Sequence, residues 1–263
     1  MKQTVNPRVA LVTGAAQGIG LRTAEVLAME GYALALNDIQ PLNKQVAHLS
    51  TSLAPHLALI GDVSQETVVE EMARNVMDHF GRLDVLVNNA GISSISPAEH
   101  ITTDEWRRVL DVNLLGPFLL SRAFGRIMLG QGAGSIVNVA SVAGLLGVAD
   151  RAAYNASKHG LIGLTRTLAA EWGGSGVRVN AVCPGWVKTP MDDASTSAGH
   201  YVDADIENRV PMARFATPDD VAQAIAVLLD DERSAFINGV ALPVDGGWTA
   251  DGGWESLRVG TRS

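Results

Sequence analysis

Tyr154 and Lys158 are two side chains whose types and spacing can do chemistry. They lie four residues apart in the segment Ala153–Trp172, which has the pattern of a helix, so both fall on one face and can act on one site. Oxidation of an alcohol needs a base for the hydroxyl proton, and reduction of a ketone needs an acid that supplies one. A tyrosine can do both when an adjacent ammonium group and a further positive charge lower its pKa from about 10. The pair therefore predicts acid–base chemistry at an alcohol or carbonyl carbon.

A glycine-rich turn is the second chemical signal. It follows the first predicted strand, opens a helix and runs Thr13-Gly14-Ala15-Ala16-Gln17-Gly18-Ile19-Gly20. Glycines let the backbone bend tightly and approach a ligand, and the N–H groups at a helix start favour phosphate. Asp38 ends the second predicted strand, where a carboxylate can accept hydrogen bonds from both hydroxyls of an adenosine ribose. These features predict an NAD site; the alternatives are a purely structural turn, and an Asp38 that only caps the turn before Pro41.

The elements that position these residues follow from the hydrophobic pattern. Short apolar runs rich in Val, Leu and Ala alternate with longer helical patterns, which predicts a single α/β domain over residues 1–263. The expected fold is a doubly wound (Rossmann) parallel seven-stranded sheet with helices on both faces. The predicted strands are Val9–Thr13, Ala33–Asn37, His56–Ile60, Val85–Asn88, Ser135–Ala140, Arg178–Cys183 and Val240–Val244. The predicted helices are Gly20–Glu30, Glu66–Phe80, Thr103–Leu129, Ala153–Trp172 and Pro218–Leu229.

Composition excludes several classes of function. The chain has 263 residues, 47% of them hydrophobic, and a net charge of −8, which argues against a nucleic-acid partner because such binding needs clustered cations. The only cysteine, Cys183, allows no intrachain disulfide, so a cytoplasmic location is the default. No apolar run is long enough for a membrane span, and no signal-peptide pattern occurs. The six histidines have no metal-binding spacing, so we expect no metal.

Together these motifs resemble the short-chain dehydrogenase/reductase family from about Arg8 to Gly247. The matching residues are Thr13-Gly14-x-x-x-Gly18-x-Gly20, Asp62-Val63, Asn88-Asn89-Ala90-Gly91, Asn113, Ser141, Tyr154-x-x-x-Lys158, Pro184-Gly185 and Asn238-Gly239-Val240…Val244-Asp245-Gly246-Gly247. The resemblance implies a catalytic set of Asn113, Ser141, Tyr154 and Lys158. It implies a cofactor-binding set of Gly14, Gln17, Gly18, Ile19, Gly20, Asp38, Asp62, Val63, Asn89, Ala90, Gly91, Tyr154, Lys158, Pro184, Gly185, Val187 and Thr189.

The resemblance also implies individual roles. Asp62 and Val63 would flank the adenine, Asn88–Gly91 would support the sheet and a ribose, and Pro184–Thr189 would lie against the nicotinamide. For Asn88 and Asn89 a turn that serves only stability is an equal alternative. Lys158 would hold the nicotinamide ribose, and Asn113 would carry a water on a proton path. Ser141 follows a predicted strand, at the end where ligands bind in such sheets, and can orient the substrate oxygen.

The predicted function is hydride transfer between NAD(H) and a secondary alcohol or ketone of a small polar molecule, such as a sugar, polyol or hydroxy acid. One alternative is a reductase of 3-oxoacyl thioesters; such an enzyme more often uses NADPH with a basic residue near position 39, which is Ile39 here. Another is a cofactor-sensing protein without turnover, which would typically lack the tyrosine or the lysine. The long helices Thr103–Leu129 and Ala153–Trp172 correspond to those that pair in the family, so a homotetramer is expected.

Other segments have weaker predictions. Thr189–Ala216 is long and polar and is expected to be a substrate lid. Arg151 is interpreted as a solvated loop residue, with an acidic substrate group as the alternative partner. Trp186 is expected to wall the substrate cleft. The tail Trp248–Ser263 lies beyond the resemblance, and folding over a neighbouring subunit is one option for it.

Overall fold

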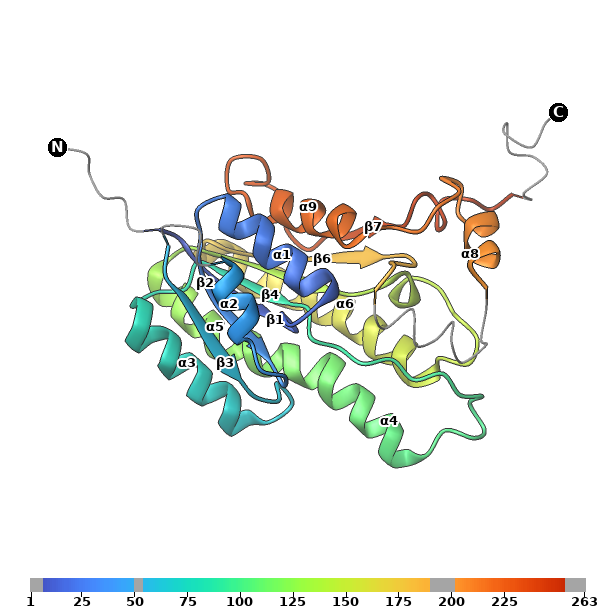
Figure 1. Ribbon diagram of the computed structural model, residues 1–263, viewed down its shortest axis with the longest axis horizontal. Coiled ribbons are helices and arrows are strands. Elements are labelled where there is room, and N and C mark those ends of the chain that lie inside the picture. Colours follow the sequence, from blue (N-terminus) through green and yellow to red (C-terminus); the bar gives the residue numbers. More distant parts are fainter. Residues whose placement is uncertain (1–6, 50–53, 190–201, 254–263) are drawn as a thin grey trace.

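Seven parallel strands form one sheet at the centre of the computed structural model, which describes residues 7–49, 54–189 and 202–253 (Figure 1). The strand order is β3-β2-β1-β4-β5-β6-β7. The strands are β1 (Val9–Thr13), β2 (Ala33–Asp38), β3 (His56–Ile60), β4 (Val85–Asn88), β5 (Gly134–Val139), β6 (Val177–Pro184) and β7 (Ala241–Val244). Each lies within one residue of its predicted bounds. The predicted doubly wound seven-stranded sheet is confirmed.

Helices cover both faces of the sheet (Figure 1). One face carries α1 (Gly18–Met29), α2 (Asn43–Leu49) and α9 (Pro218–Leu229). The other carries α3 (Glu66–Phe80), α5 (Gly116–Gln131) and α6 (Ala152–Trp172), and α4 (Thr103–Leu110) packs against α6. The short helix α8 (Asp203–Arg209) packs its residue Ile206 against Trp186 in a small separate cluster. The sequence pattern did not predict α2, whose seven residues bury only Leu49.

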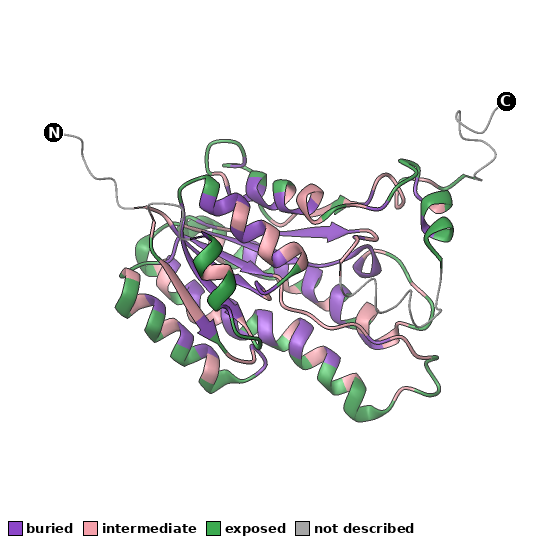
Figure 2. Ribbon diagram, in the orientation of Figure 1, coloured by how far each residue is buried: buried purple, intermediate pink, exposed green. Residues whose placement is uncertain are grey.

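Each strand supplies side chains to two cores, because successive residues point to opposite faces. In β1, Val12 belongs to the cluster that contains Leu27 of α1 and Ile225 of α9, whereas Leu11 belongs to the cluster that contains Phe124 of α5. Figure 2 shows these inner surfaces buried and the outer helix faces exposed. Burial on both faces explains why the strands are continuous apolar runs.

The helical backbone predicted over Thr103–Leu129 is continuous from Thr103 to Gln131, but it is not α-helical throughout. Helix α4 ends at Leu110, a π-helical turn covers Asp111–Leu115, and α5 starts at Gly116. Asn113, in the middle of this turn, is fully buried, and its side chain bonds both backbone groups of Ile92, at 2.8 and 2.9 Å. Such turns insert one residue into a helix and often occur at functional sites. The hydrophobic period alone does not reveal the insertion.

The predicted lid, Thr189–Ala216, is described only in part, since residues 190–201 lie outside the described residues. Its described portion contains α8 and rejoins the fold at a parallel bridge between Val187 and Ala216.

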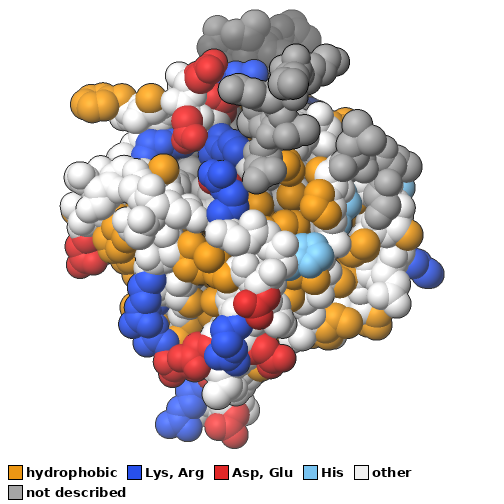
Figure 3. Space-filling view, turned by 90° about the vertical axis from the view of Figure 1, so that its left-hand side faces the viewer, with side chains coloured by type: hydrophobic (Ala, Val, Ile, Leu, Met, Phe, Trp, Pro, Cys, Tyr) orange, Lys and Arg blue, Asp and Glu red, His pale blue; other side chains and the backbone are white. Residues whose placement is uncertain are grey.

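Among the helices of the described ranges, none is long and apolar enough to cross a bilayer. Figure 3 shows one surface of the molecule, where acidic and basic side chains lie close to one another.

Candidate active site

A cavity of about 410 Å³ lies at the carboxyl ends of β1, β2, β4, β5 and β6. The strand order reverses between β1 and β4: β2 and β3 lie on one side of β1, and β4 to β7 lie on the other. Open α/β sheets bind ligands at such a point. All of the predicted site residues line the cavity except Gly20 and Asn113. The residues that the sequence separates by up to 175 positions, from Gly14 to Thr189, therefore face one space.

The glycine-rich turn forms one wall of this cavity. Gly18 starts α1 with φ +58°, a conformation that side chains with a Cβ rarely adopt. The N-cap residue, Gln17, makes no capping hydrogen bond with its side chain, and the first turn of α1 contains no acidic residue. The helix-start N–H groups therefore remain suited to an anionic ligand such as a pyrophosphate.

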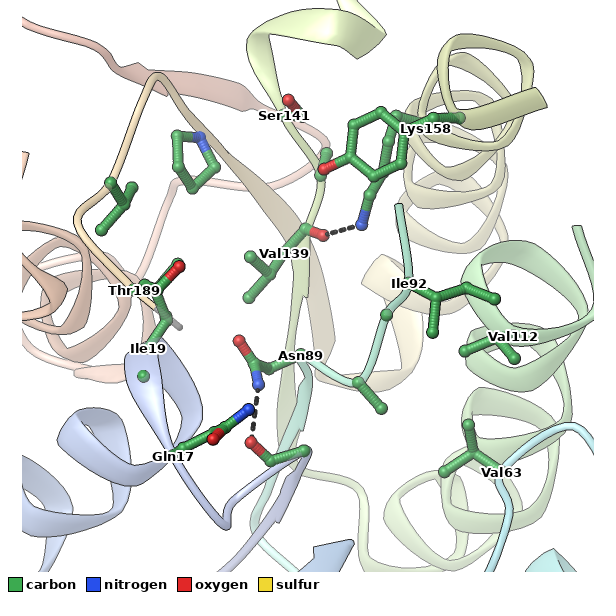
Figure 4. Close-up of a pocket in the computed structure, with 18 of the residues that line it drawn as sticks. Gln17, Ile19, Val63, Asn89, Ile92, Val112, Val139, Ser141, Lys158 and Thr189 are labelled. Atoms are coloured by element: carbon green, nitrogen blue, oxygen red, sulfur yellow. Dashed lines mark hydrogen bonds between the residues drawn. The ribbon is translucent and has the colours of Figure 1, made fainter. Parts of the chain in front are cut away.

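Asn88 and Asn89 hold the sheet and this turn together. The Asn89 side-chain amide donates to the carbonyls of Thr13 and Gly14, at 2.9 and 3.1 Å, and Asn89 also lines the cavity (Figure 4). Asn88 is buried, does not line the cavity, and donates to Asn138 Oδ1 at 2.8 Å. Asn88 therefore has the purely stabilising role given as the alternative, whereas Asn89 is placed both to stabilise the turn and to contact a ligand in the cavity.

Gly20 serves the packing of the turn, because a Cβ there would lie 2.1 Å from the carbonyl oxygen of Gly14. We expect Gly20→Ala to lower the free energy of unfolding by about 1–3 kcal/mol and to weaken cofactor binding. The matched control is Gly130→Ala in α5, where a Cβ would meet nothing within 4 Å. That control is expected to be unchanged or up to about 1 kcal/mol more stable. Urea unfolding curves measure both, and equal stability of the two variants would contradict the packing argument.

Two carboxylates lie at one end of the cavity. Asp38 accepts hydrogen bonds from the backbone N–H groups of Ala16 and Gln40, both at 3.0 Å. It thus caps the turn that follows β2, as the structural alternative held, and it also ties β2 to the glycine-rich turn. Each oxygen still has a lone pair free for a ribose hydroxyl. Arg22, the one cation of α1, forms ion pairs with Glu25 and Asp219, both at 2.8 Å.

Asp62 is held by a cation that the sequence analysis did not single out. Arg108 Nη1 lies 3.0 Å from Asp62 Oδ2, and the Ser64 backbone and hydroxyl donate to Asp62 Oδ1 at 2.9 and 2.7 Å. Burial acts to raise the pKa of the Asp62 carboxyl, but the Ser64 and Arg108 contacts outweigh it and keep the pKa below its usual value. Arg108 belongs to none of the family motifs, and its position in α4 brings it to the cavity.

The predicted acid–base residues lie together at the other end. Ser141 follows β5 after Ala140, and its side chain lies close enough to the Tyr154 phenol of α6 to act against the rise in the Tyr154 pKa. Lys158, on the same helix, donates from Nζ to the carbonyl of Val139 at 2.7 Å (Figure 4). Lys158 Nζ lies 5.5 Å from the centre of the Tyr154 ring. A proton donor or acceptor, an orienting hydroxyl and an ammonium group thus share one surface.

The expected lowering of the Tyr154 pKa by Lys158 is wrong for the protein alone. Burial raises the pKa of Tyr154, with Ser141 and Arg151 acting in the opposite direction. Burial also lowers the pKa of the Lys158 ammonium to about 8. The desolvation of both groups therefore outweighs their proximity, since a low-dielectric site disfavours the charged form of each.

Asn113 lies behind this group rather than in the cavity wall. A Cβ placed on Gly91 would be 3.2 Å from Asn113 Oδ1 and 3.7 Å from Lys158 Nζ, so both groups approach the same glycine. The Asn113 amide also donates to Ser157 Oγ at 3.2 Å. The π-helical turn thus delivers Asn113 to the vicinity of Lys158, and its part in a proton path remains a prediction.

The opposite wall starts at the last residue of β6 and consists of Pro184, Gly185, Val187 and Thr189. Trp186 also lines the cavity, and its ring stacks on that of Trp248 with centroids 3.8 Å apart. The first residues of the C-terminal tail therefore pack on their own chain, next to the cavity. Residues 254–263 of the tail lie outside the described residues.

Two residues near the catalytic group lie outside the cavity wall. Cys183 is fully buried, and burial raises the pKa of its thiol to about 11, as expected for a small side chain packed in the core. His159 is exposed on α6, with Nδ1 2.9 Å from the carbonyl oxygen of Asn155. Within the described ranges, no three side chains of His, Cys, Asp or Glu gather as a metal site.

The cavity matches the parts of a dinucleotide. A Cβ on Gly14 would lie 2.8 Å from the Asn89 amide, so only glycine fits at this position. A glycine backbone also lets phosphate groups approach closely. The carboxylates of Asp38 and Asp62 lie at one end, and Ser141, Tyr154 and Lys158 lie at the other. A Rossmann sheet with such a site defines a nicotinamide-dependent oxidoreductase.

The comparisons with known proteins lead to the same class. A family model described as enoyl-(acyl carrier protein) reductase matches residues 14–249. The chain is 41% identical to the D-threitol dehydrogenase of Mycolicibacterium smegmatis, over 92% of this chain and 93% of that protein. It is 38% identical to a 3-oxoacyl-[acyl-carrier-protein] reductase of Synechocystis, over 91% and 96%. It is 41% identical to the cis-4-hydroxycyclohexanecarboxylate dehydrogenase of Sinomonas cyclohexanicum, over 95% and 100%.

Solved structures agree with the sequence matches. The crystal structure of levodione reductase superimposes with a TM-score of 0.88 at 37% identity, covering 92% of this chain and 98% of that one. The structure of ElxO with NADP bound gives 0.87 at 32% identity, covering 93% and 100%. The chain belongs to the short-chain dehydrogenase/reductase family. It is an oxidoreductase that acts on alcohol or ketone groups with a nicotinamide cofactor.

Proposed function

We propose that the chain is an NAD-dependent dehydrogenase of a secondary alcohol on a small polar molecule, and that residues 1–263 form one cofactor-binding and catalytic domain. The observation that supports this most is the single cavity with Asp38 at one end and Ser141, Tyr154 and Lys158 at the other. Among the described residues, the end of β2 has the Asp38 carboxylate and no cation beside it, which favours NAD, whose adenosine ribose has two free hydroxyls.

The residues have distinct tasks in this proposal. Ser141 donates a hydrogen bond to the substrate oxygen and fixes its position next to the Tyr154 phenol. Tyr154 accepts the proton from the hydroxyl in oxidation and returns it in reduction. Lys158, whose Nζ donates to the Val139 carbonyl, would hold the nicotinamide ribose, and Asn113 would support the route by which the proton leaves. The bound nicotinamide supplies the hydride acceptor or donor.

The experiment is a spectrophotometric screen that follows the absorbance of the reduced nicotinamide. Sugars, polyols and hydroxy acids are offered with NAD and with NADP, and the matching ketones with the reduced cofactors. We expect NAD reduction with at least one secondary alcohol. Absence of turnover together with tight cofactor binding would support a cofactor sensor instead.

A reductase of 3-oxoacyl thioesters is the second candidate, and the likeness to the Synechocystis reductase favours it. Such an enzyme would prefer NADPH, for which Ile39 and Gln40 at the adenosine end supply no cation. Acetoacetyl thioesters in the same screen distinguish the two. Faster turnover of these thioesters with NADPH than of any polar alcohol with NAD would favour the reductase.

We also propose a homotetramer. Leu115 of the π-helical turn and Phe118 of α5 leave about two fifths of their surface exposed, at 40% and 39%, on an element expected to pair between subunits. Multi-angle light scattering should give the mass of four chains. A mass near the 27.7 kDa of one chain would contradict the proposal.

A further inference from the structure

The catalytic end of the cavity contains a cation that the proposed mechanism does not use. The charged residues of the cavity wall are Asp38, Asp62, Arg108, Arg151 and Lys158. Both carboxylates lie at the adenosine end, and Arg108 is paired with Asp62 there. Among the described residues, the wall around Tyr154 therefore contains Arg151 and Lys158 and no carboxylate.

Arg151 is held in place but not neutralised. It precedes α6 as its N-cap residue, and its backbone forms a bridge to Ser96. Its Nη1 donates to Ser93 Oγ at 2.8 Å. In the part of the chain that the structure describes, this is the only hydrogen bond of the guanidinium, and no carboxylate lies within ion-pair distance. The side chain is half-buried.

A half-buried guanidinium without a counter-ion is costly, because burial removes water from a charge that nothing compensates. In a chain of net charge −8, acidic partners for a surface arginine are plentiful. The Ser93 contact leaves the remaining N–H groups of a rigid planar fork available, and such forks match carboxylates through two parallel hydrogen bonds. The charge also reaches the reacting group, since it acts on the ionisation of Tyr154.

We propose that Arg151 binds a carboxylate of the substrate, so that the enzyme oxidises a hydroxy acid rather than a neutral polyol. This inference rests on the proposed dehydrogenase function. Arg151 lies three residues before Tyr154 at the start of the same helix, so a carboxylate bound there holds one end of a small molecule while Ser141 and Tyr154 engage its hydroxyl. The likeness to a dehydrogenase of cis-4-hydroxycyclohexanecarboxylate is in keeping with this substrate class.

The test compares three hydroxy acids with their primary amides, which keep size and hydroxyl groups but remove the charge. The pairs are 4-hydroxycyclohexanecarboxylate, gluconate and 3-hydroxybutyrate, each with its amide. For the best pair we expect kcat/KM to favour the acid by about tenfold or more in the wild type. Arg151→Gln should lower kcat/KM about a hundredfold for the acid and less than about threefold for the amide, mainly through KM. Arg151→Lys should restore part of the preference.

The control is Arg74→Gln on the exposed side of α3, which makes the same change in net charge away from the cavity. It should leave the acid-to-amide ratio unchanged. An equal loss for acid and amide in Arg151→Gln would assign the residue to the fold or to Tyr154, and would overturn the proposal. Oxidation of neutral alcohols such as threitol without oxidation of any acid would also overturn it, while leaving the dehydrogenase function intact. Failure of every alcohol with either cofactor would instead reject the proposed function.

Discussion

Tyr154→Phe is expected to reduce kcat about a thousandfold or more while cofactor affinity changes less than about twofold. The substitution removes only the hydroxyl, which is the group proposed to exchange the substrate proton. The ring and its position over the Lys158 ammonium remain. The measurements are kcat with the best alcohol from the screen and NADH binding by fluorescence titration.

The matched control is Tyr32→Phe, the same chemical change at a buried tyrosine in the core cluster of α1 and α9. It should change kcat less than about twofold. If Tyr154→Phe retains most of its activity, another group transfers the proton. If it loses NADH binding as well, the hydroxyl acts on the cofactor site instead, and the acid–base assignment is wrong.

Cofactor choice is expected to depend on Asp38, with kcat/KM for NAD about a hundredfold or more above that for NADP. This ratio corresponds to about 2.7 kcal/mol. A phosphate on the adenosine ribose would meet the Asp38 carboxylate, and the neighbouring wall residues Ile39 and Gln40 supply no positive charge. Arg22 is occupied by Glu25 and Asp219 and does not offset the repulsion.

Because Asp38 also accepts the N–H groups of Ala16 and Gln40, Asp38→Ala should weaken binding of both cofactors. The informative quantity is therefore the ratio of kcat/KM values, which should fall towards one. Asp38→Asn retains one acceptor oxygen and separates the loss of charge from the loss of the turn contacts. Asp104→Asn on the exposed start of α4 controls for net charge. An unchanged ratio in both Asp38 variants, or equal use of NAD and NADP by the wild type, would show that Asp38 does not discriminate.

The elements that depend on local patterns were predictable from the sequence. The strands are apolar runs because both faces of a parallel sheet are buried, and helix α3 has its predicted bounds, Glu66–Phe80. The glycine-rich turn was predictable because part of its requirement is local: Gly14 and Gly18 have positive φ angles, and Gly20 packs on the carbonyl of Gly14. The family motifs then indicated which side chains share a site, since they end neighbouring strands or lie on one face of α6.

Contacts between distant segments were decided only by the tertiary structure. The insertion at Asn113 depends on the Ile92 backbone, the Arg108–Asp62 ion pair joins α4 to the end of β3, and Trp186 stacks on Trp248 from the tail. The direction of the Tyr154 pKa shift could not be predicted from the sequence either. The spacing of Tyr154 and Lys158 predicts that they are close, but it does not predict the burial that opposes ionisation of the phenol. The sequence thus determined which chemical groups this protein has at its site. The tertiary structure determined how far those groups are buried and which partners they contact, because burial and contacts depend on segments that are distant in the sequence.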